Sequence, residues 1–412
     1  MKKLVFITSL FYLTFSYAQN LSPIFGDTIN TGHQINISSF NFYASNSFNN
    51  TLTNTFIYGG NINQDLKDFN QSNLGKSNTT GGKAEQKIEY INFNITPFKK
   101  LKNYGIIASI EDINLLSSNV SSDLYNTILY GNNNYLGDTM DFSYSHAQYL
   151  HYQKISIGLI HKKLKSSLKL GFIIGSRSLD YRLGNTWMNS SSLSDSIHIK
   201  LNGEAHSTDS TTNYFDSKGY GFSIDLEHNV IYNNKKGKQQ VINFTLGNIG
   251  LVFWNSNTNY QYVDSKNTYS GFDVMSLINR DTSNALYSLD TLGINSITKS
   301  QAKLLPFELS MQKLANRYSD QKFQLIFGFK AIILSDYKPY IFVGAYYSPN
   351  QKIGFSSRIA YGGFGGLKVG LNANYWIKNK FEIAIGTYDA IGFISNKHGY
   401  GKSLHLSAGL KF

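Results

Sequence analysis

Residues 401–412 read Gly401-Lys402-Ser403-Leu404-His405-Leu406-Ser407-Ala408-Gly409-Leu410-Lys411-Phe412. Apolar and polar side chains alternate through this stretch with a period of two. A β-strand with this pattern presents one face to hydrocarbon and the opposite face to water. A soluble β-sandwich can also end on such a strand, so the rest of the chain must decide between the two.

The same alternation recurs in blocks of about ten residues, the length of a membrane-spanning β-strand. The clearest blocks are 168–175, 220–232, 322–331, 353–361 and 367–375. In the second block Asp225 and Glu227 share the face opposite to the apolar residues, and two carboxylates on one face exclude that face from contact with lipid. Placed on strands in this way, the charged residues predicted to face a lumen are Lys169, Asp225, Glu227, Lys330, Arg358, Lys368 and Glu382.

The connections between these blocks are of two kinds. Six short polar turns are expected at 99–103, 162–166, 233–238, 316–320, 348–351 and 378–380. Four long stretches rich in Asn, Ser and Thr are expected to form surface loops at 44–85, 114–139, 181–217 and 254–303. Short turns on one rim and long loops on the other are typical of an outer-membrane barrel, with the short turns in the periplasm. Six short turns with both chain ends on the same rim predict about 14 strands.

The fold class expected is therefore all-β, a transmembrane antiparallel outer-membrane β-barrel with short periplasmic turns and long extracellular loops. The composition agrees, because 29 Tyr, 28 Phe, 35 Gly and only 5 Pro favour strands and turns over helices. A mean hydropathy of −0.26 is too low for a helical membrane protein. A soluble sandwich would vary its loop lengths less systematically, and a propeller would need a repeat of blade length that the chain lacks.

The amino terminus has the three parts of a secretory signal peptide: Lys2 and Lys3, the apolar run 4–15, and the small-residue site Ser16-Tyr17-Ala18. We expect 1–18 to be the signal peptide, 19–33 a periplasmic or plug segment, and 34–412 the barrel. The chain contains no cysteine, so no disulfide can stabilise it after export. The expected location is the bacterial outer membrane.

Three segments in the last third of the chain carry a family resemblance: 337–347, 358–371 with its motif Gly362-Gly363-Phe364-Gly365-Gly366, and 381–412. They resemble the carboxy-terminal half of an uncharacterised family of outer-membrane barrels from Bacteroidota, a domain of unknown function within the FadL-like and PorV-like barrels. Many of those proteins carry Asn-Pro-Ala near the mature amino terminus. This chain has Asn20-Leu21-Ser22-Pro23 there, so the resemblance does not imply a FadL-type hatch. The final strand, ending on an aromatic residue, resembles the signal read by the barrel assembly machinery, and its residues would be Leu404, Leu406, Leu410 and Phe412.

The sequence predicts no enzyme and no cofactor. The histidines show no metal-ligand spacing, since His146 and His151 are an odd number of residues apart and would lie on opposite faces of one strand. Asp225, Glu227 and His228 are the nearest approach to an acid–base set, but in a regular strand His228 points away from the two acids. The Gly-rich motif joins two strands and is not a phosphate-binding loop before a helix.

The formal charge of +12 leaves two interpretations open. Lumen cations can be neutralised by acids across the barrel, or they can favour anions and the phosphates of lipopolysaccharide. Expected partners are outer-membrane lipid and lipopolysaccharide, the assembly machinery during biogenesis, and components of secretion or gliding systems, with no nucleic acid.

Two functions are compatible with the sequence. The first is solute passage through a FadL- or PorV-like barrel, with a lumen that is open, narrow or plugged. The second is a structural or assembly role of the PorV or PorP/SprF kind in type IX secretion, gliding or another surface machinery. The segment 340–347 is apolar on both faces, which indicates a filled interior or a wall covered by a partner.

Overall fold

A computed structural model describes residues 24–25, 32–208, 213–214, 216–234, 237–269, 293–378 and 380–412. The expected signal peptide and most of the segment 19–33 lie outside these residues. The elements are β1 (Ile24–Phe25), β2 (His33–Ser45), α2 (Asn50–Tyr58), α3 (Gln64–Gln71), β3 (Asn78–Asn92), β4 (Tyr104–Val120), α4 (Ser122–Tyr130), η1 (Asn133–Tyr135), β5 (Thr139–Asp141), β6 (His146–His161), β7 (Ser167–Leu183), β8 (Trp187–Ser190), β9 (Ile197–Ser207), β10 (Gly219–Asn233), β11 (Gln239–Trp254), β12 (Asn259–Tyr269), β13 (Asn295–Thr298), β14 (Gln301–Leu304), β15 (Glu308–Asn316), β16 (Phe323–Ile332), β17 (Lys338–Asn350), β18 (Ile353–Gly363), β19 (Leu367–Ile377), β20 (Phe381–Thr387), α6 (Ile391–Ile394) and β21 (Gly401–Lys411).

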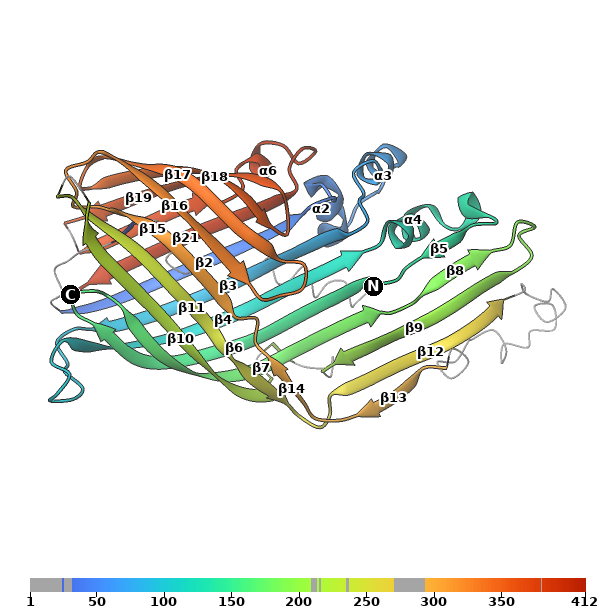
Figure 1. Cartoon of the computed structure of the whole chain (residues 1–412), viewed down its shortest axis with the longest axis horizontal. Coiled ribbons are helices and arrows are strands. Elements are labelled where there is room, and N and C mark those ends of the chain that lie inside the picture. The colour runs from blue at the N-terminus through green and yellow to red at the C-terminus, as the bar shows by residue number, and fades with distance from the viewer. Residues whose placement is uncertain are drawn as a thin grey trace.

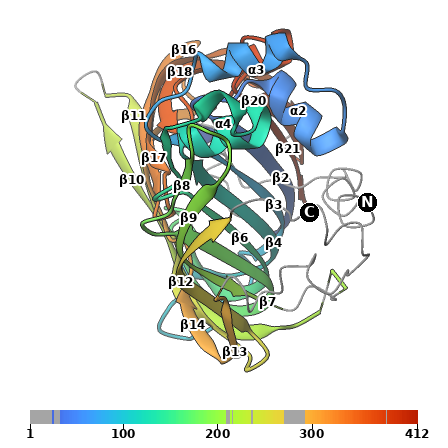
Figure 2. The same cartoon turned by 90° about the vertical axis from the view of Figure 1, so that its right-hand side faces the viewer.

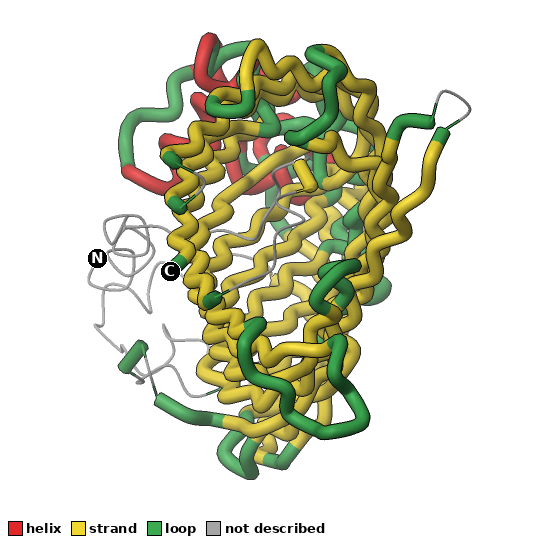
Figure 3. The backbone as a smooth tube through the Cα atoms, turned by 90° about the vertical axis from the view of Figure 1, so that its left-hand side faces the viewer, coloured by secondary structure: helices red, strands yellow, loops and turns green. Residues whose placement is uncertain are grey.

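Fourteen of the strands form a closed antiparallel barrel, as predicted (Figure 1). In order around the wall they are β2, β3, β4, β6, β7, β10, β11, β15, β16, β17, β18, β19, β20 and β21. Pairing of β2 with β21 closes the ring, and it begins where His33 and Phe412 exchange two backbone hydrogen bonds of 2.7 and 2.9 Å. Figure 3, seen from the short-turn end, shows the strands running around the wall.

The wall is inside out compared with a soluble protein. Outward side chains such as Phe222, Ile359 and Tyr361 are apolar and more than half exposed, whereas Lys83, Glu85 and Glu111 on inner faces are almost fully buried. Exposed aromatic residues lie toward both rims, with Tyr232, Phe323, Tyr375 and Phe412 near the short turns and Phe253 and Tyr361 near the extracellular strand ends. An apolar outer band with an aromatic girdle and a polar interior identifies a membrane barrel of the outer-membrane type. The predicted location in the outer membrane is thereby confirmed.

Among the described residues, no helix has the length and apolar character needed to cross a membrane. The helices α2, α3, α4 and α6 lie at the end of the barrel opposite to the short turns (Figure 1). By the rule that short turns are periplasmic, this helix-bearing rim is extracellular.

The expectation that four long stretches form loops is wrong in part. Barrel strands extend into them, and α2, α3, α4 and the strands β8, β9, β12 and β13 fold within them. The reason is that Asn and Ser, which favour loops, also cap helices. Asn49, Asn63 and Ser121 each accept a hydrogen bond from a backbone N–H in the first turn of α2, α3 and α4 respectively.

Two short extracellular turns fold inward and contact the opposite wall. In the β16–β17 turn, the carbonyl of Ser335 accepts a hydrogen bond of 2.5 Å from Ser117 of β4, and Asp336 pairs with His146 of β6. In the β18–β19 turn, Phe364 is buried against Gly81 of β3, where even a Cβ would overlap its ring. These two turns therefore reach across the extracellular mouth of the lumen.

Candidate functional site: the barrel lumen

The lumen holds a cavity of about 320 Å³. On β2 its lining follows the inner face for the whole length of the strand, from Gln34 to Ala44. On β4, β6 and β11 the lining ends at mid-height, at Glu111, Lys154 and Asn248 respectively. The cavity is therefore wide toward the periplasm and confined to one side toward the cell exterior.

An apolar cluster packs the extracellular part of the lumen above Glu111 and Lys154. Its residues project from the strands β4, β6, β7 and β11 and from two connections, and they are Ile113, Leu115, Leu150, Tyr152, Ile173, Val252, Trp254, Leu305 and Leu334. The Trp254 ring lies over Gly175 of β7, where a Cβ would come within 2.8 Å of it. A bulkier residue at that position would displace the ring, so Gly175 makes this part of the interior close-packed.

A ladder of alternating charges runs along the inner face of β3. Lys83, Glu85, Lys87 and Glu89 occupy successive inward positions, because residues two apart share a face. Lys83 forms ion pairs with Glu85 and with Glu308 of β15. Lys87 pairs with Glu89 at 2.6 Å.

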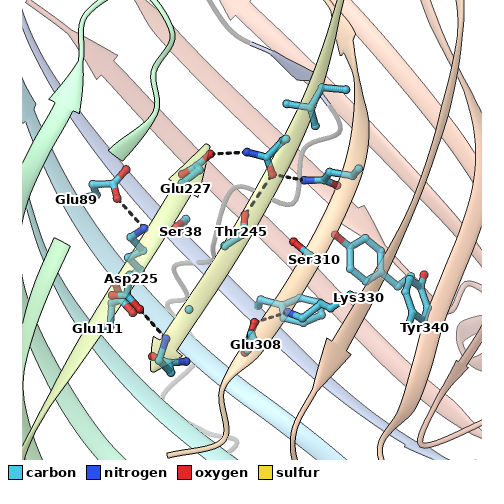
Figure 4. A pocket seen from close by; sticks show the side chains of 18 of the residues that line it. Ser38, Glu89, Glu111, Asp225, Glu227, Thr245, Glu308, Ser310, Lys330 and Tyr340 are labelled. Atoms are coloured by element: carbon cyan, nitrogen blue, oxygen red, sulfur yellow. Dashed lines mark hydrogen bonds and ion pairs between the residues drawn. The ribbon is translucent and has the colours of Figure 1, made fainter. Parts of the chain in front are cut away.

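The ladder continues around the wall as a charged belt, seen in Figure 4. Lys154 lies 2.9 Å from Glu111 and 3.0 Å from Asp225. Lys169 lies 3.6 Å from Glu111 and 3.7 Å from Glu89.

Asn248 has a left-handed backbone conformation within a β-bulge of β11, where Gly247 and Asn248 together oppose Asp225 of β10, and it completes this part of the belt. Its side-chain oxygen accepts from Lys154 at 2.7 Å, and its backbone N–H donates to Asp225 at 2.7 Å. The bulge therefore turns one extra polar group toward the ions.

On the other side of the cavity, Lys330 of β16 pairs with Glu308 at 2.7 Å. Every belt lysine thus has a carboxylate partner. Desolvation of buried ions is expensive, and attraction between partners offsets that cost only while each partner is present. The charges of the belt therefore neutralise one another. We do not expect such a neutral belt to attract an ion strongly from solution.

The seven residues that the sequence places toward a lumen all line this cavity. Four belong to the belt: Lys169, Asp225, Lys330 and also Glu227, which accepts a 2.9 Å hydrogen bond from Asn243. The other three, Arg358, Lys368 and Glu382, lie on β18, β19 and β20, where no ion pair closer than 4.0 Å is found among the described residues.

An aromatic cluster surrounds Arg358. Its members come from β2, from β17 and from three extracellular turns, and they are Phe40, Phe42, Tyr337, Tyr340, Phe342, Phe364 and Tyr388. The Arg358 guanidinium carbon lies 4.0 Å from the ring centre of Tyr388 and 5.3 Å from that of Phe342. These are cation–π distances.

Sequence reasoning missed Lys83, Glu85, Lys87, Glu89 and Lys154 as lumen residues. The first two were assigned to the long loop 44–85. The available signal was the spacing Lys-x-Glu-x-Lys-x-Glu, which on a strand places four charges on one face and Ala84, Gln86 and Ile88 on the other.

The remaining sequence candidates are placed as follows. Leu404, Leu410 and Phe412 of the last strand are exposed on the outer face, and Leu406 is partly exposed on the same face. His228 lies 3.3 Å from Ser166 and does not join Asp225 and Glu227. The described part of the chain contains no group of three or more His, Cys, Asp or Glu side chains that could hold a metal ion.

Comparison with known proteins gives matches to solved structures alone. No protein-family model matches the chain. No curated protein matches it in sequence. Structures that are similar over most of their length include a FadL homologue from Pseudomonas aeruginosa (11% identity, 92% of this chain and 90% of that one, TM-score 0.41). Another is a deltaS2 mutant of the TodX monoaromatic hydrocarbon channel (7% identity, 93% of this chain and 91% of that one, TM-score 0.39). A third is the translocator domain of the autotransporter NalP from Neisseria meningitidis (10% identity, 94% of this chain and 90% of that one, TM-score 0.32). At these identities and TM-scores the likeness carries no argument about function.

Proposed function

We propose that this protein is an outer-membrane barrel that admits a small solute to its lumen and passes it when the extracellular turns move aside. The observation that carries the proposal is the cavity, which at about 320 Å³ falls at the lower end of the size range of small-molecule sites. A barrel with a purely structural role has no need of such a space, because side chains can fill its interior. The proposal includes no catalytic chemistry and no cofactor.

Within the described residues, the barrel is obstructed on the extracellular side. The apolar cluster around Trp254 packs the extracellular part of the lumen, and the turns at 333–337 and 364–366 lie across the mouth. Passage therefore requires displacement of these turns, which are the short connections of the extracellular rim. Lipid and lipopolysaccharide would surround the apolar outer band, and the assembly machinery would act on the last strand.

A second candidate is a structural or assembly role of the PorV or PorP/SprF kind. The elements α2, α3 and α4 gather over one part of the extracellular rim, and β9, β12 and β13 extend from another (Figure 2). These elements provide a surface for a secretion or gliding partner, and such a role tolerates a closed lumen.

Planar-bilayer conductance of the refolded protein distinguishes the two. For passage, we expect a wild-type barrel with brief openings and a Trp254→Ala variant with brief openings of larger conductance, because removal of the ring empties the centre of the apolar cluster while the turns still control access. A matched control is Trp376→Ala, which removes an indole at the periplasmic end, outside the apolar cluster.

Heat-modifiable migration on gels verifies folding of each variant before recording. If folded wild type and Trp254→Ala are both silent, and neither admits small solutes into liposomes, passage is refuted. Co-purification of partners from the outer membrane would then test the assembly role.

A further inference from the structure

The cation Arg358 differs from the belt lysines in having no counterion among the residues that the structure describes. Its side chain is 4% exposed, yet no carboxylate of the described chain lies within ion-pair distance of it. Its Nε and Nη2 atoms are buried without a hydrogen-bond acceptor. The hydroxyl of Tyr388 lies within hydrogen-bonding reach of the guanidinium.

The barrel is shaped to hold the side chain in this position. Glycines flank Arg358 on both neighbouring strands: Gly344 of β17 and Gly370 of β19 are its register partners. A Cβ on Gly370 would lie 2.7 Å from the Arg358 Cγ, and one on Gly344 would lie 2.9 Å from its Cβ. The two glycines therefore leave a trough along which the arginine extends between the rings of Phe342 and Tyr388.

Other buried cations of the chain are satisfied in different ways. Lys368, on the neighbouring strand, donates to the turn carbonyls of Gly362 at 2.8 Å and Gly366 at 3.4 Å. Arg317, at the periplasmic rim, is also 4% exposed and lies 4.4 Å from the Trp376 ring centre. However, its Nε donates to the Gln351 carbonyl at 2.8 Å.

An arginine always carries its charge, and a buried charge without a partner is strongly unfavourable. Two unsatisfied N–H donors on one guanidinium edge match the two oxygens of a carboxylate. A second buried donor without an acceptor, the hydroxyl of Tyr340, belongs to the same aromatic cluster. The surrounding rings suit a flat apolar body, which stacks on aromatic faces.

We infer that Arg358 is the anchor of a binding site for a small aromatic monocarboxylate, with Tyr340, Phe342 and Tyr388 around the ring of the ligand. The inference names the solute class of the proposed passage function, but it requires binding alone. Nε and Nη2 are not exposed to the cavity, so a carboxylate reaches them through a rotamer change in the cluster. Binding is therefore expected to alter the near-ultraviolet circular dichroism of the tyrosines.

Isothermal titration calorimetry of the refolded full chain in a non-ionic detergent tests the site with three probes. Benzoate has both the ring and the carboxylate, benzyl alcohol has the ring alone, and acetate has the carboxylate alone. We expect benzoate to bind at least ten times more tightly than either of the others, with a change in the tyrosine dichroism.

The variant Arg358→Gln is expected to weaken benzoate binding ten- to a hundredfold and to abolish the dichroism change. Arg358→Lys, which keeps the charge and loses the bidentate geometry, should give an intermediate affinity. The matched control Arg317→Gln removes an equally buried arginine outside the cavity and should bind as wild type does. Heat-modifiable migration shows whether each variant is folded, and Arg358→Lys keeps the test decisive if Arg358→Gln does not fold.

Equal benzoate affinity in wild type and in a folded Arg358 variant overturns the inference, and so does benzyl alcohol binding as tightly as benzoate. Absence of benzoate binding to wild type also overturns it. Benzoate binding, with no conductance and no solute entry into liposomes for wild type or Trp254→Ala, would leave the site standing and refute passage. Conductance that Arg358→Gln leaves unchanged, without benzoate binding to wild type, would refute the site and leave passage standing.

Discussion

Asp336→Asn tests the ion pair that holds the β16–β17 turn across the mouth of the barrel. The Asp336 carboxylate lies 2.5 Å from Nε2 of His146, and Nδ1 of His146 lies 3.2 Å from the carbonyl of Tyr144. An imidazolium, with a proton on each nitrogen, donates to both acceptors at once. Asp336 has a φ of 63°, and asparagine tolerates this left-handed conformation, so the substitution removes the charge and leaves the backbone unstrained.

The magnitude follows from the exposure of the pair. The side chains of His146 and Asp336 are 20% and 17% exposed, so solvent still screens the attraction. Exposed pairs contribute up to about 1 kcal/mol and hydrogen bonds to charged groups about 1.5–3 kcal/mol, which places this pair at about 1–2 kcal/mol. The ratio of closed to displaced turn should then fall about 5- to 30-fold in Asp336→Asn.

The same pair predicts a pH dependence. His146 is the first residue of β6 and lies at the extracellular rim, outside the apolar band, opposite the polar Asn119 and Arg182. The hydrogen bond to Asp336 raises the pKa of His146, and the charge of Asp336 adds to this effect, while burial and the nearby Arg182 oppose it. A histidine with a raised pKa in the closed state stabilises that state fully below its ordinary value of about 6.5. This stabilisation is lost as the pH rises through the raised pKa. Wild-type openings should therefore become more frequent above about pH 6.5, and Asp336→Asn should open often at every pH.

Single-channel recording over a pH series measures both effects. Asp320→Asn makes the same chemical change in an exposed turn on the opposite rim and serves as the matched control. In a double-mutant cycle, His146→Gln should add little to Asp336→Asn, because the two residues act as one contact. An unchanged open probability in Asp336→Asn, or a pH dependence that persists in this variant, would show that the ion pair between His146 and Asp336 does not hold the turn closed.

Three further outcomes are expected. Glu111→Gln leaves two buried lysines short of a partner and should lower the free energy of unfolding by about 3–5 kcal/mol in urea titrations in lipid vesicles. The exposed Glu204→Gln should change it by less than about 0.5 kcal/mol, and equal effects would contradict a structural role for the belt. Gly81→Ala places a methyl group in the ring of Phe364 and should displace its turn, seen as more frequent channel openings; unchanged openings would mean that the turn does not limit access. Asn49→Ala removes the cap of α2 at a cost of about 1 kcal/mol, so limited proteolysis should cut near α2 faster, while a cleavage rate equal to wild type would show that contacts with the rim hold the helix.

The face of each barrel strand was predictable because a strand repeats every two residues. The block 220–232 shows this directly: Tyr220 and Phe222 are exposed on the outer wall, and Asp225 lines the cavity. The six short turns likewise predicted 14 strands, since each turn joins two neighbours.

The long stretches were harder to predict because Asn and Ser fit both a loop and a helix cap. Asn49 and Ser121 satisfy N–H groups at helix starts, which composition cannot distinguish from an ordinary loop position. The charges Lys83 and Glu85 were missed with the stretch that contains them.

The sequence by itself determined a membrane barrel with a polar interior, because alternation and turn length are local properties of the chain. The tertiary structure alone decided which inward groups meet. Lys154 and Asp225 are 71 residues apart, and Ser117 and Ser335 are 218 apart, yet closure of the barrel brings each pair into contact. Alternation with a period of two specifies the face on which a residue lies, but it does not specify which residue across the lumen it contacts. Only the folded barrel therefore distinguishes the belt lysines, which are neutralised by carboxylates, from Arg358, which has no carboxylate partner among the described residues.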